Sequence, residues 1–493
     1  MNTMKIHQSD NVILALEDIS AGCAAYGDGI SLVTKDTVPR GHKIAVRDLK
    51  EGDPVIKYGA VIGIAAKDIS TGEHVHVHNV KTALSGQREF SYQPFECELP
   101  KREHRSFQGY IRKDGSVGIR NEIWILPTVG CVGSAAKRLA EENKDLIKGS
   151  IDGIHAFVHP YGCSQMGEDH ETTGKILAAL ARHPNAGGVL ILSLGCENLT
   201  HEQMKEKLGD YDPERIRFLC CQECEDEMQE GRKILQELSE YASAFHRESV
   251  DAQELIVGVK CGGSDGLSGI TANPAVGGFS DMLIEMGGST VLSEVPEMFG
   301  AEEMLLSRCK DRDTFDRAVK MIRDFKEYYI RHGQVIYENP SPGNKAGGIT
   351  TLEDKSCGCV QKGGGAAVSD VLSYGEGVKS HGLSLLSGPG NDLVSTTALT
   401  AAGAHLILFT TGRGTPFGAP VPTIKIASNT RLFESKPNWI DCNAGSIADG
   451  TQTLKQVSEM LLEKVLSVSS GEQTKQELGN NREIAIWKNG VTL

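Results

Sequence analysis

The sequence has few aromatic residues and no long hydrophobic run. Aromatic side chains make up 5% of its 493 residues, and apolar segments such as GGVLILSLG are too short to cross a bilayer. The first ten residues, MNTMKIHQSD, lack the apolar core of a signal peptide. The absence of these signals predicts a cytoplasmic protein without a membrane partner.

Basic residues are outnumbered by acidic ones. The chain has 51 Lys and Arg residues against 65 Asp and Glu, which gives a formal net charge of −14. This charge argues against nucleic acid as a partner, and an anionic ligand would need local cations to hold it. The 13 cysteines are irregularly spaced, so we expect reduced thiols, some of them metal ligands, and not a disulfide framework.

The pattern of residue types along the sequence divides the chain into four parts. Residues 1–80 contain short β-branched runs between glycine turns, which is typical of a small β-rich domain. Residues 81–107 are polar, which is typical of a linker. From residue 108 strands alternate with helices, which predicts α/β domains with a parallel sheet. We place a second domain at 108–250 and a C-terminal domain at 251–493, with an amphipathic helix over 314–331.

Chemically active side chains follow the predicted strands of the α/β part. Because ligands of open parallel sheets bind beyond the carboxyl ends of the strands, these residues are candidate metal ligands. They are His159, Cys163, Cys196, Glu197, Cys261, Asp265 and Glu294. Thiolates and imidazoles suit Fe(II) or Zn(II), and carboxylates suit Fe(II) or Mn(II). Any single cysteine here is more simply a small buried residue at a tight turn, but the set predicts a metal site if the strands bring it together.

The segment VKCGGSDGLSGITANP, residues 259–274, raises the question of phosphate binding. It contains neither a GxxxxGK[ST] pattern nor a clean GxGxxG before a helix, so we expect no bound nucleotide. A Ser264-Asp265 pair beside Cys261 suits a metal and a hydroxylated ligand better. Asn273 and Pro274 are expected as the N-cap and the first residue of the following helix.

Histidines and a lysine supply candidate acid and base groups. The segment EHVHVHN alternates strictly, which predicts a strand with His74, His76 and His78 on one face, either as metal ligands or as an exposed histidine-rich surface. His42 in RGHK is either a turn residue or an acid/base group. Lys345 lies in the constrained loop NPSPGNKAGG.

Two further cysteine groups have no clear role in the sequence. They are Cys220-Cys221-x-x-Cys224 and Cys357-x-Cys359. A structural zinc site from both groups is disfavoured, because they lie far apart in the chain and neither is a paired CxxC ribbon.

Over its whole length the chain resembles the altronate and galactarate dehydratase family. The segments that carry the resemblance include GSVGIRNEIWILPTVGCV, YGCSQ, LGCEN, CGGSDGLSGITANPAVG, SEVPEMFGAE, NPSPGNKAGGITTLEDKS, FTTGRGTPFG and the terminal NGVTL. EHVHVHN and TTLEDKSCGC look like the altronate branch. The resemblance implies a β-clip (SAF-like) first domain, a variant Rossmann-type C-terminal domain, a homodimer, and dependence on Fe(II), with Mn(II) as the alternative.

The resemblance also implies the reaction. In the altronate branch, water is eliminated from D-altronate to give 2-dehydro-3-deoxy-D-gluconate in hexuronate catabolism, and galactarate or another 2-hydroxy acid is the alternative substrate. A nicotinamide-dependent oxidoreductase and a sugar-acid-binding protein without turnover are the rival classes.

Elimination of water needs a base for the proton next to the carboxylate and an acid for the departing hydroxyl. We expect Lys345 or His42 as the base, and the other of the two or His76 as the acid. Residues expected to bind the sugar acid are Arg120, Asn121, Lys260, Ser264, Asn273, Asn344 and Arg413.

Overall fold

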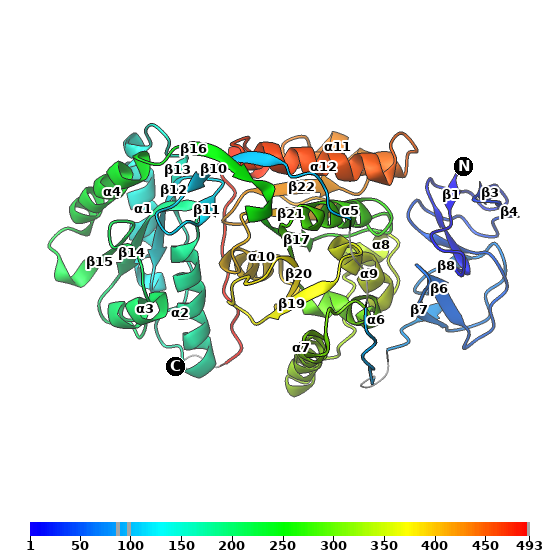
Figure 1. Cartoon of the computed structure of the whole chain (residues 1–493). Helices are drawn as coiled ribbons and strands as arrows, with labels where there is room; N and C mark the ends of the chain where they lie inside the picture. The colour runs from blue at the N-terminus through cyan, green and yellow to red at the C-terminus, as the bar shows by residue number, and fades with distance from the viewer. Residues whose placement is uncertain (85–88, 96–99, 491–493) are drawn as a thin grey trace.

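The computed structural model describes residues 1–84, 89–95 and 100–490. In Figure 1 the C-terminal domain lies between the first domain and the second domain. Part of the predicted linker and the last three residues of the NGVTL motif lie outside the described residues.

The first domain consists of short antiparallel strands. Three sheets form, with the orders β1-β2-β5-β8, β3-β4 and β6-β7-β9. The strands are β1 (Thr3–Met4), β2 (Val12–Ala15), β3 (Ala24–Gly27), β4 (Ile30–Val33), β5 (Lys43–Ala45), β6 (Pro54–Lys57), β7 (Ala60–Ala65), β8 (His74–Val75) and β9 (Val80–Lys81). Buried aliphatic side chains such as Ile13, Ile44 and Val55 fill the space between them. The predicted β-rich domain is confirmed.

The histidine-rich strand is shorter than predicted. β8 ends at Val75, and residues 76–79 form a turn. Asn79 stabilises the turn, because its side chain accepts from the backbone N–H of His76 and donates to the carbonyl of His74. The alternation in HVHVH therefore does not continue as a strand, although the rings of His74 and His76 still stack at 5.5 Å.

The second domain has a parallel four-stranded sheet of order β13-β12-β14-β15 with helices packed around it. The strands are β12 (Glu122–Pro127), β13 (Gly153–Ala156), β14 (Ala186–Ser193) and β15 (Ile216–Cys220), and the helices are α1 (Gly133–Glu142), α2 (Gly167–Arg182), α3 (His201–Leu208) and α4 (Glu227–Ser243). A separate antiparallel sheet contains β10 (Ser106–Ile111), β11 (Val117–Gly118) and β16 (Arg247–Asp251).

The C-terminal domain is built on a parallel seven-stranded sheet of order β19-β20-β18-β17-β21-β22-β23. Its strands are β17 (Ile256–Cys261), β18 (Ser289–Leu292), β19 (Val368–Leu372), β20 (Gly382–Leu386), β21 (Leu406–Thr411), β22 (Thr423–Ala427) and β23 (Cys442–Asn443). Apart from β19 at the edge, the strands follow the doubly wound order 3-2-1-4-5-6. The predicted α/β regions with parallel sheets are thus confirmed.

Helices cover both faces of this sheet. They are α5 (Ala272–Glu285), α6 (Glu302–Leu306), α7 (Arg312–Arg331), α8 (Pro342–Ala346), α9 (Leu352–Cys359), α10 (Asp392–Ala401), α11 (Thr430–Ser435), α12 (Leu454–Ser469) and α13 (Lys475–Leu478). Helix α7 agrees with the amphipathic helix predicted over 314–331, and it buries Phe315, Ile322 and Phe325.

Helix α5 begins earlier than predicted. Its N-cap is Thr271, so Asn273 lies within the first turn. The Asn273 side chain does not cap the helix, because it is buried and donates to the carbonyl of Gly358 at 3.0 Å and accepts from the hydroxyl of Thr410 at 2.6 Å. Asn273 therefore ties α5 to α9 and β21.

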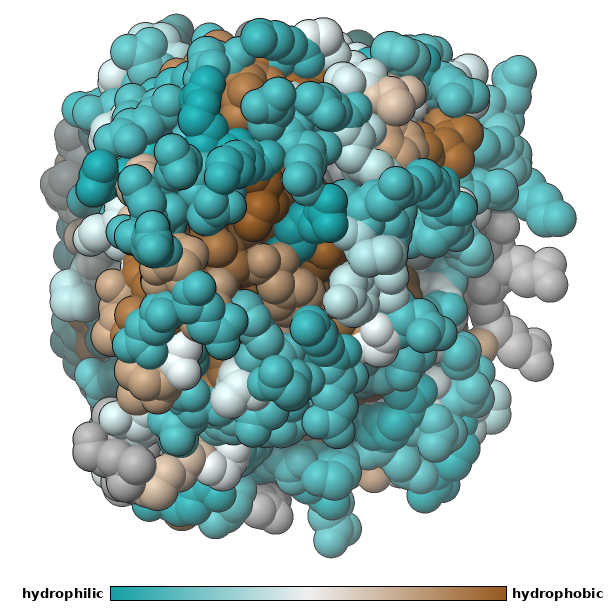
Figure 2. Space-filling model, turned by 90° about the vertical axis from the view of Figure 1, so that its left-hand side faces the viewer, coloured by the Kyte–Doolittle hydropathy of each residue, from teal (hydrophilic) through white to brown (hydrophobic). Residues whose placement is uncertain are grey.

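No helix in the described part of the chain is long and apolar enough to cross a membrane. Figure 2 views the molecule from the side of the second domain and shows a mainly hydrophilic surface with smaller hydrophobic areas.

Candidate functional site

The glycine-rich segment after β17 brings the first domain against the C-terminal domain. A Cβ atom at Gly266 would lie 1.9 Å from the carbonyl oxygen of Gly41, and one at Gly348 would lie 2.2 Å from the same atom. The N–H of Gly266 also donates to the carbonyl of Gly347 at 2.7 Å. The glycines are needed because three backbone segments meet there without room for side chains.

A small, narrow cavity of about 10 Å³ lies at this junction. The first domain contributes Lys57 and Tyr58 to its wall, and the C-terminal domain contributes Ser264, Lys355 and Cys359, among others. Because both domains line it, neither domain alone encloses the cavity.

Three histidines of the first domain gather beside α8. Nδ1 of His42 lies 2.9 Å from Nε2 of His74, and one ring nitrogen from each of His42, His74 and His76 lies within 4.8 Å of the other two. Nε2 of His42 approaches the carbonyl oxygen of Ala346 at 3.4 Å, next to Lys345. The group therefore faces the loop that carries the predicted base.

The imidazoles of this group are held neutral. Burial, together with the positive charge of Lys43, lowers the pKa of His42 below its ordinary value. Burial and neighbouring cationic groups lower the pKa of His74 to about 4 and that of His76 to about 3. Neutral imidazole is the form that binds metal ions.

A buried ion network joins the first domain to α9. Asp354 accepts from Lys43 at 2.8 Å and from Lys57 at 3.0 Å, and all three side chains are at most 2% exposed. Burial alone would raise the pKa of Asp354, but Lys43 and Lys57 hold it well below its usual range. Removing the carboxylate would leave two buried ammonium groups without a counter-charge.

A second group of metal-binding side chains lies beneath the cavity. The sulfur of Cys261 is 3.4 Å from that of Cys359 and 3.0 Å from Oε2 of Glu297. Lys362 donates to the Cys261 sulfur at 3.0 Å, and Lys355 pairs with Glu297 at 2.8 Å. The hydrogen bond from Cys359 and the nearby ammonium groups lower the pKa of the Cys261 thiol to about 6. We call these residues the buried thiol centre.

Glu294 extends this centre toward the sheet. Its side chain accepts from Lys260, which also pairs with Asp392 at 2.9 Å. Burial and the nearby carboxylate of Glu297 raise the pKa of Glu294 to about 8. The Glu294 backbone has a φ of 71°, a left-handed conformation that costs energy for a non-glycine residue and often marks a functional position.

The structure divides the predicted metal ligands between two sheets. Cys261 and Glu294 follow β17 and β18 and lie together, whereas His159, Cys163, Cys196 and Glu197 follow strands of the second domain. Among the described residues, no close group of metal-binding atoms joins the two sets. The structure does not bring Cys163 and Cys196 together with Cys261, because their strands belong to different sheets.

Asp265 organises its own loop. It accepts from Ser268 and Ser428, and from the side chain of Asn429 at 3.1 Å. These contacts use both carboxylate oxygens, and Asp265 is in neither of the two groups above.

Several residues predicted to bind substrate have structural partners. Arg120 is 2% exposed and forms a double hydrogen bond with Glu477, which ties the second domain to α13. Asn121 is buried between the Arg112 side chain and the carbonyl of Ala242. Lys260 is fully buried in its ion pairs. These three side chains cannot reach a ligand without breaking buried contacts.

Other predicted residues lie at the junction. Ser264 lines the cavity, and the side chain of Asn344 donates to its carbonyl at 2.7 Å. Arg413 is exposed beside Gly343 of α8. Sequence reasoning did not identify Lys355 and Lys362, because these cations become buried only when α9 and the turn after it pack against the sheet.

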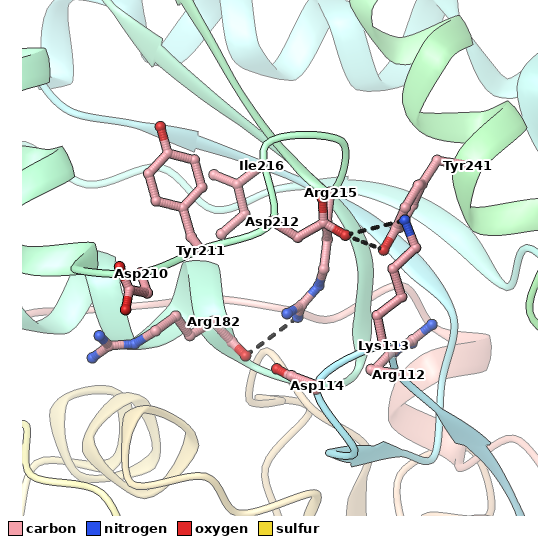
Figure 3. A pocket seen from close by; sticks show the side chains of 10 residues that line it. All are labelled: Arg112, Lys113, Asp114, Arg182, Asp210, Tyr211, Asp212, Arg215, Ile216 and Tyr241. Carbon is pink, nitrogen blue, oxygen red and sulfur yellow. Dashed lines mark hydrogen bonds and ion pairs between the residues drawn. The ribbon is translucent and has the colours of Figure 1, made fainter.

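A larger hollow, of about 300 Å³, lies elsewhere (Figure 3). It is at the amino ends of the second-domain strands, next to Ile216 at the start of β15 and Arg182 at the end of α2. Its buried arginines, Arg112 and Arg215, already donate to backbone carbonyls. It is therefore remote from the strand ends where candidate catalytic groups gather.

The architecture and the site define a multidomain α/β protein whose first, SAF-type domain closes a polar cavity. Three family models match in order: Altronate/galactarate dehydratase SAF domain at residues 1–83, D-galactarate dehydratase/Altronate hydrolase, second domain, at 109–243, and D-galactarate/Altronate dehydratase, C-terminal, at 252–492.

Curated relatives match along the whole chain. It is 52% identical to altronate dehydratase of Bacillus subtilis (strain 168), over 99% of both chains, and 50% identical to altronate dehydratase of Escherichia coli (strain K12), over 100% of both. Identity to the L-threo-forming galactarate dehydratase of Escherichia coli (strain K12) is 32%, over 98% of this chain and 96% of the relative. The chain belongs to the altronate and galactarate dehydratase family.

Proposed function

We propose that this chain is an altronate dehydratase, a hydro-lyase that converts D-altronate into 2-dehydro-3-deoxy-D-gluconate and water. The observation that carries the proposal is the identity of 50% and 52% to two altronate dehydratases over the full length, against 32% to a galactarate dehydratase. The proton on C2 is removed, the hydroxyl on C3 leaves as water, and the resulting enol becomes the 2-keto acid.

We assign the divalent metal to His42, His74 and His76. Three neutral imidazoles with close ring nitrogens suit Fe(II), with Mn(II) as the alternative. The buried thiol centre suits an added cation less well, because Lys362 already contacts the Cys261 sulfur and Lys355 the Glu297 carboxylate. A bound ion supplies positive charge that makes the proton next to the substrate carboxylate easier to remove.

Lys345 is proposed as the base that takes the C2 proton. It lies on α8, whose Ala346 carbonyl approaches His42, so its backbone is fixed beside the histidines. The capping box of Ser341 and Asn344 holds this short helix in place. His76 is a poor candidate for the acid, because a pKa of about 3 leaves no proton to donate from an imidazolium at neutral pH.

Cationic and hydroxyl groups of the junction are proposed to hold the sugar acid. Lys57, Lys355 and Ser264 line the cavity, and Arg413 is exposed at the neighbouring loop. The two lysines are paired with Asp354 and Glu297, so they set the charge of the wall, and Ser264 and Arg413 are proposed as the groups that contact the sugar acid.

A substrate panel tests the proposal. Reduced protein with added Fe(II) is incubated with aldonates and aldarates, without a nicotinamide cofactor, and 2-keto-3-deoxy acid is measured. We expect kcat/KM for D-altronate at least about tenfold above that for galactarate. If only galactarate gave product, the proposed substrate would be wrong. If activity required NAD, the proposed reaction class would be wrong.

The remaining predictions stay proposals. We keep the boundaries at 1–80, 81–107, 108–250 and 251–493, a β-clip first domain and a Rossmann-variant C-terminal domain, which the strand order of the seven-stranded sheet supports. A homodimer and a cytoplasmic, reducing location are also retained; the free thiols of the described residues support the latter.

A further inference from the structure

Three exposed cysteines lie on neighbouring loops of the second domain. Cys131 follows β12, Cys163 follows β13 and Cys196 follows β14. These strands are parallel neighbours in the order β13-β12-β14, so their carboxyl ends lie at one edge of the sheet. Among the described cysteines only Cys23, in the first domain, is also exposed.

Hydrogen bonds tie the three loops to one another. Each bond lies within three residues of a cysteine on both of the loops that it joins. The bonds run from Gly130 N–H to Tyr161 O (2.9 Å), from Ser164 N–H to Asn198 Oδ1 (2.8 Å) and from Thr128 Oγ1 to Glu197 Oε1 (2.6 Å). Every pair of loops is thus connected, so the three cysteines lie on loops that are bonded to one another at one edge of the sheet.

The backbone next to these cysteines is tightly constrained. Ser164 has a φ of 60°, although it is not a glycine. A Cβ atom at Gly162 would lie 1.8 Å from the carbonyl oxygen of Thr128, so only glycine permits the two loops to approach so closely. Such strain is retained where a structure must fix particular side chains.

The predicted metal ligands His159 and Glu197 form hydrogen bonds with these same loops. Nε2 of His159 lies 2.7 Å from the carbonyl oxygen of Pro127, and Glu197 also accepts from the backbone N–H groups of Leu194 and Gly195. Both side chains are engaged with the loops themselves. The exposed thiols are therefore the groups left to face a ligand.

Thiols in such a position favour a soft metal. Cysteine is among the most buried residue types, so three exposed thiols on fixed, adjacent loops need an explanation other than packing. Among the described residues, the sulfur atoms of Cys131, Cys163 and Cys196 do not lie close enough together to surround a single metal ion. In a four-iron, four-sulfide cluster each cysteine binds a different iron, which suits thiols that come from separate loops at one edge of a sheet.

We propose that Cys131, Cys163 and Cys196 bind an iron–sulfur cluster at the carboxyl edge of the second-domain sheet. Three cysteines leave one cluster position without a protein thiolate. The cysteines at the end of β15 differ, since Cys220 is buried and burial raises the pKa of the partly buried Cys221 to about 12. The inference does not depend on altronate as the substrate.

Anaerobic reconstitution tests the site. The full-length protein is treated with ferrous iron and sulfide under reducing conditions and desalted, and bound iron, acid-labile sulfide and visible absorption are measured. We expect roughly equal amounts of bound iron and sulfide in the unaltered protein and in Cys23→Ser. Each of Cys131→Ser, Cys163→Ser and Cys196→Ser should lower bound sulfide at least tenfold.

Two controls make the outcome decisive. Unchanged thermal unfolding of the three variants shows that the loss is local, and Cys221→Ser should keep the bound sulfide. The proposal is overturned if the three variants keep the sulfide content of the unaltered protein, if Cys221→Ser alone loses it, or if the unaltered protein binds iron without sulfide.

Discussion

Cysteines follow parallel strands in both α/β domains, but their surroundings differ. Cys261 is 1% exposed, lies against Cys359 and receives a hydrogen bond from Lys362. Cys163 and Cys196 of the second domain are exposed and contact no ammonium group among the described ion pairs and hydrogen bonds. A thiol with a buried cation beside it is already satisfied, whereas an exposed thiol on a fixed loop can bind a ligand.

The contrast separates two tasks. The junction of the first and C-terminal domains combines a polar cavity, neutral histidines and buried lysines, which fits proton removal from a sugar acid. The edge of the second domain offers thiols without comparable charge. We therefore propose dehydration with its divalent ion at the junction and a separate iron–sulfur site at the second-domain edge, and the predictions below test this division.

The largest effect is expected at the proposed base. Lys345→Ala should lower kcat on D-altronate by about 10²- to 10⁴-fold, because no other ammonium group occupies its place on α8. Lys320→Ala, an exposed lysine of α7, should stay within a factor of two. Steady-state kinetics measure both. Near-native turnover by Lys345→Ala would remove the lysine from the mechanism.

The interdomain ion network should dominate stability at the junction. Asp354→Asn leaves Lys43 and Lys57 buried without a counter-charge and should lower the free energy of unfolding by about 3–5 kcal/mol. Asp68→Asn breaks the exposed pair of Asp68 and Lys50 and should leave the free energy of unfolding nearly unchanged, because solvent screens an exposed ion pair. Denaturant unfolding compares the two variants, and equal losses would contradict the structural role of Asp354.

The two kinds of cysteine should also differ in stability. Cys261→Ala removes the partner of Lys362 and a contact of Glu297, so we expect a loss of about 2–4 kcal/mol. Cys163→Ala changes an exposed residue and should stay within roughly 0.5 kcal/mol. If both variants unfold at the same denaturant concentration, the contrast between buried and exposed thiols fails.

A smaller effect is expected from pH. His183 and His405 are fully buried where the two α/β domains meet, and burial lowers their pKa values to about 3 and 4. The folded state therefore needs neutral rings, while the unfolded chain takes up protons below pH 6.5. The contribution should be essentially complete above pH 6.5 and fall by roughly 1–2 kcal/mol per histidine between pH 6.5 and 5.

The variant His183→Gln checks this assignment, because glutamine does not titrate. Its melting temperature should depend less on pH over this range than that of the unaltered protein. An unchanged pH dependence would assign the acid sensitivity to other groups.

The sequence allowed the order of strands and helices to be predicted better than the grouping of residues. Helix α7 was visible from its apolar period, and the strand before Cys261 from its apolar run. Which strands share a sheet depends on long-range pairing, so the separation of Cys196 from Cys261 could not be read from spacing. The partner of Arg120 could not be predicted for the same reason, because Glu477 lies 357 residues further along the chain.

Local structure was also mispredicted where side-chain hydrogen bonds outweighed the sequence pattern. The alternation of HVHVH predicted a strand, yet the side chain of Asn79 turns the chain after Val75. Asn273 has the composition of an N-cap, but it bonds Gly358 and Thr410 instead. Both asparagines are buried, and a buried amide satisfies whichever partners the packed structure offers.

The most direct test of the account is the turnover of D-altronate by a chain that carries His42→Gln, His74→Gln and His76→Gln together. The control is His104→Gln, an exposed histidine outside the junction. We predict that kcat/KM falls at least about 10³-fold in the triple variant, with unfolding and second-domain sulfide unchanged. A folded triple variant with the kcat/KM of the control would contradict a catalytic site at the junction of the first and C-terminal domains.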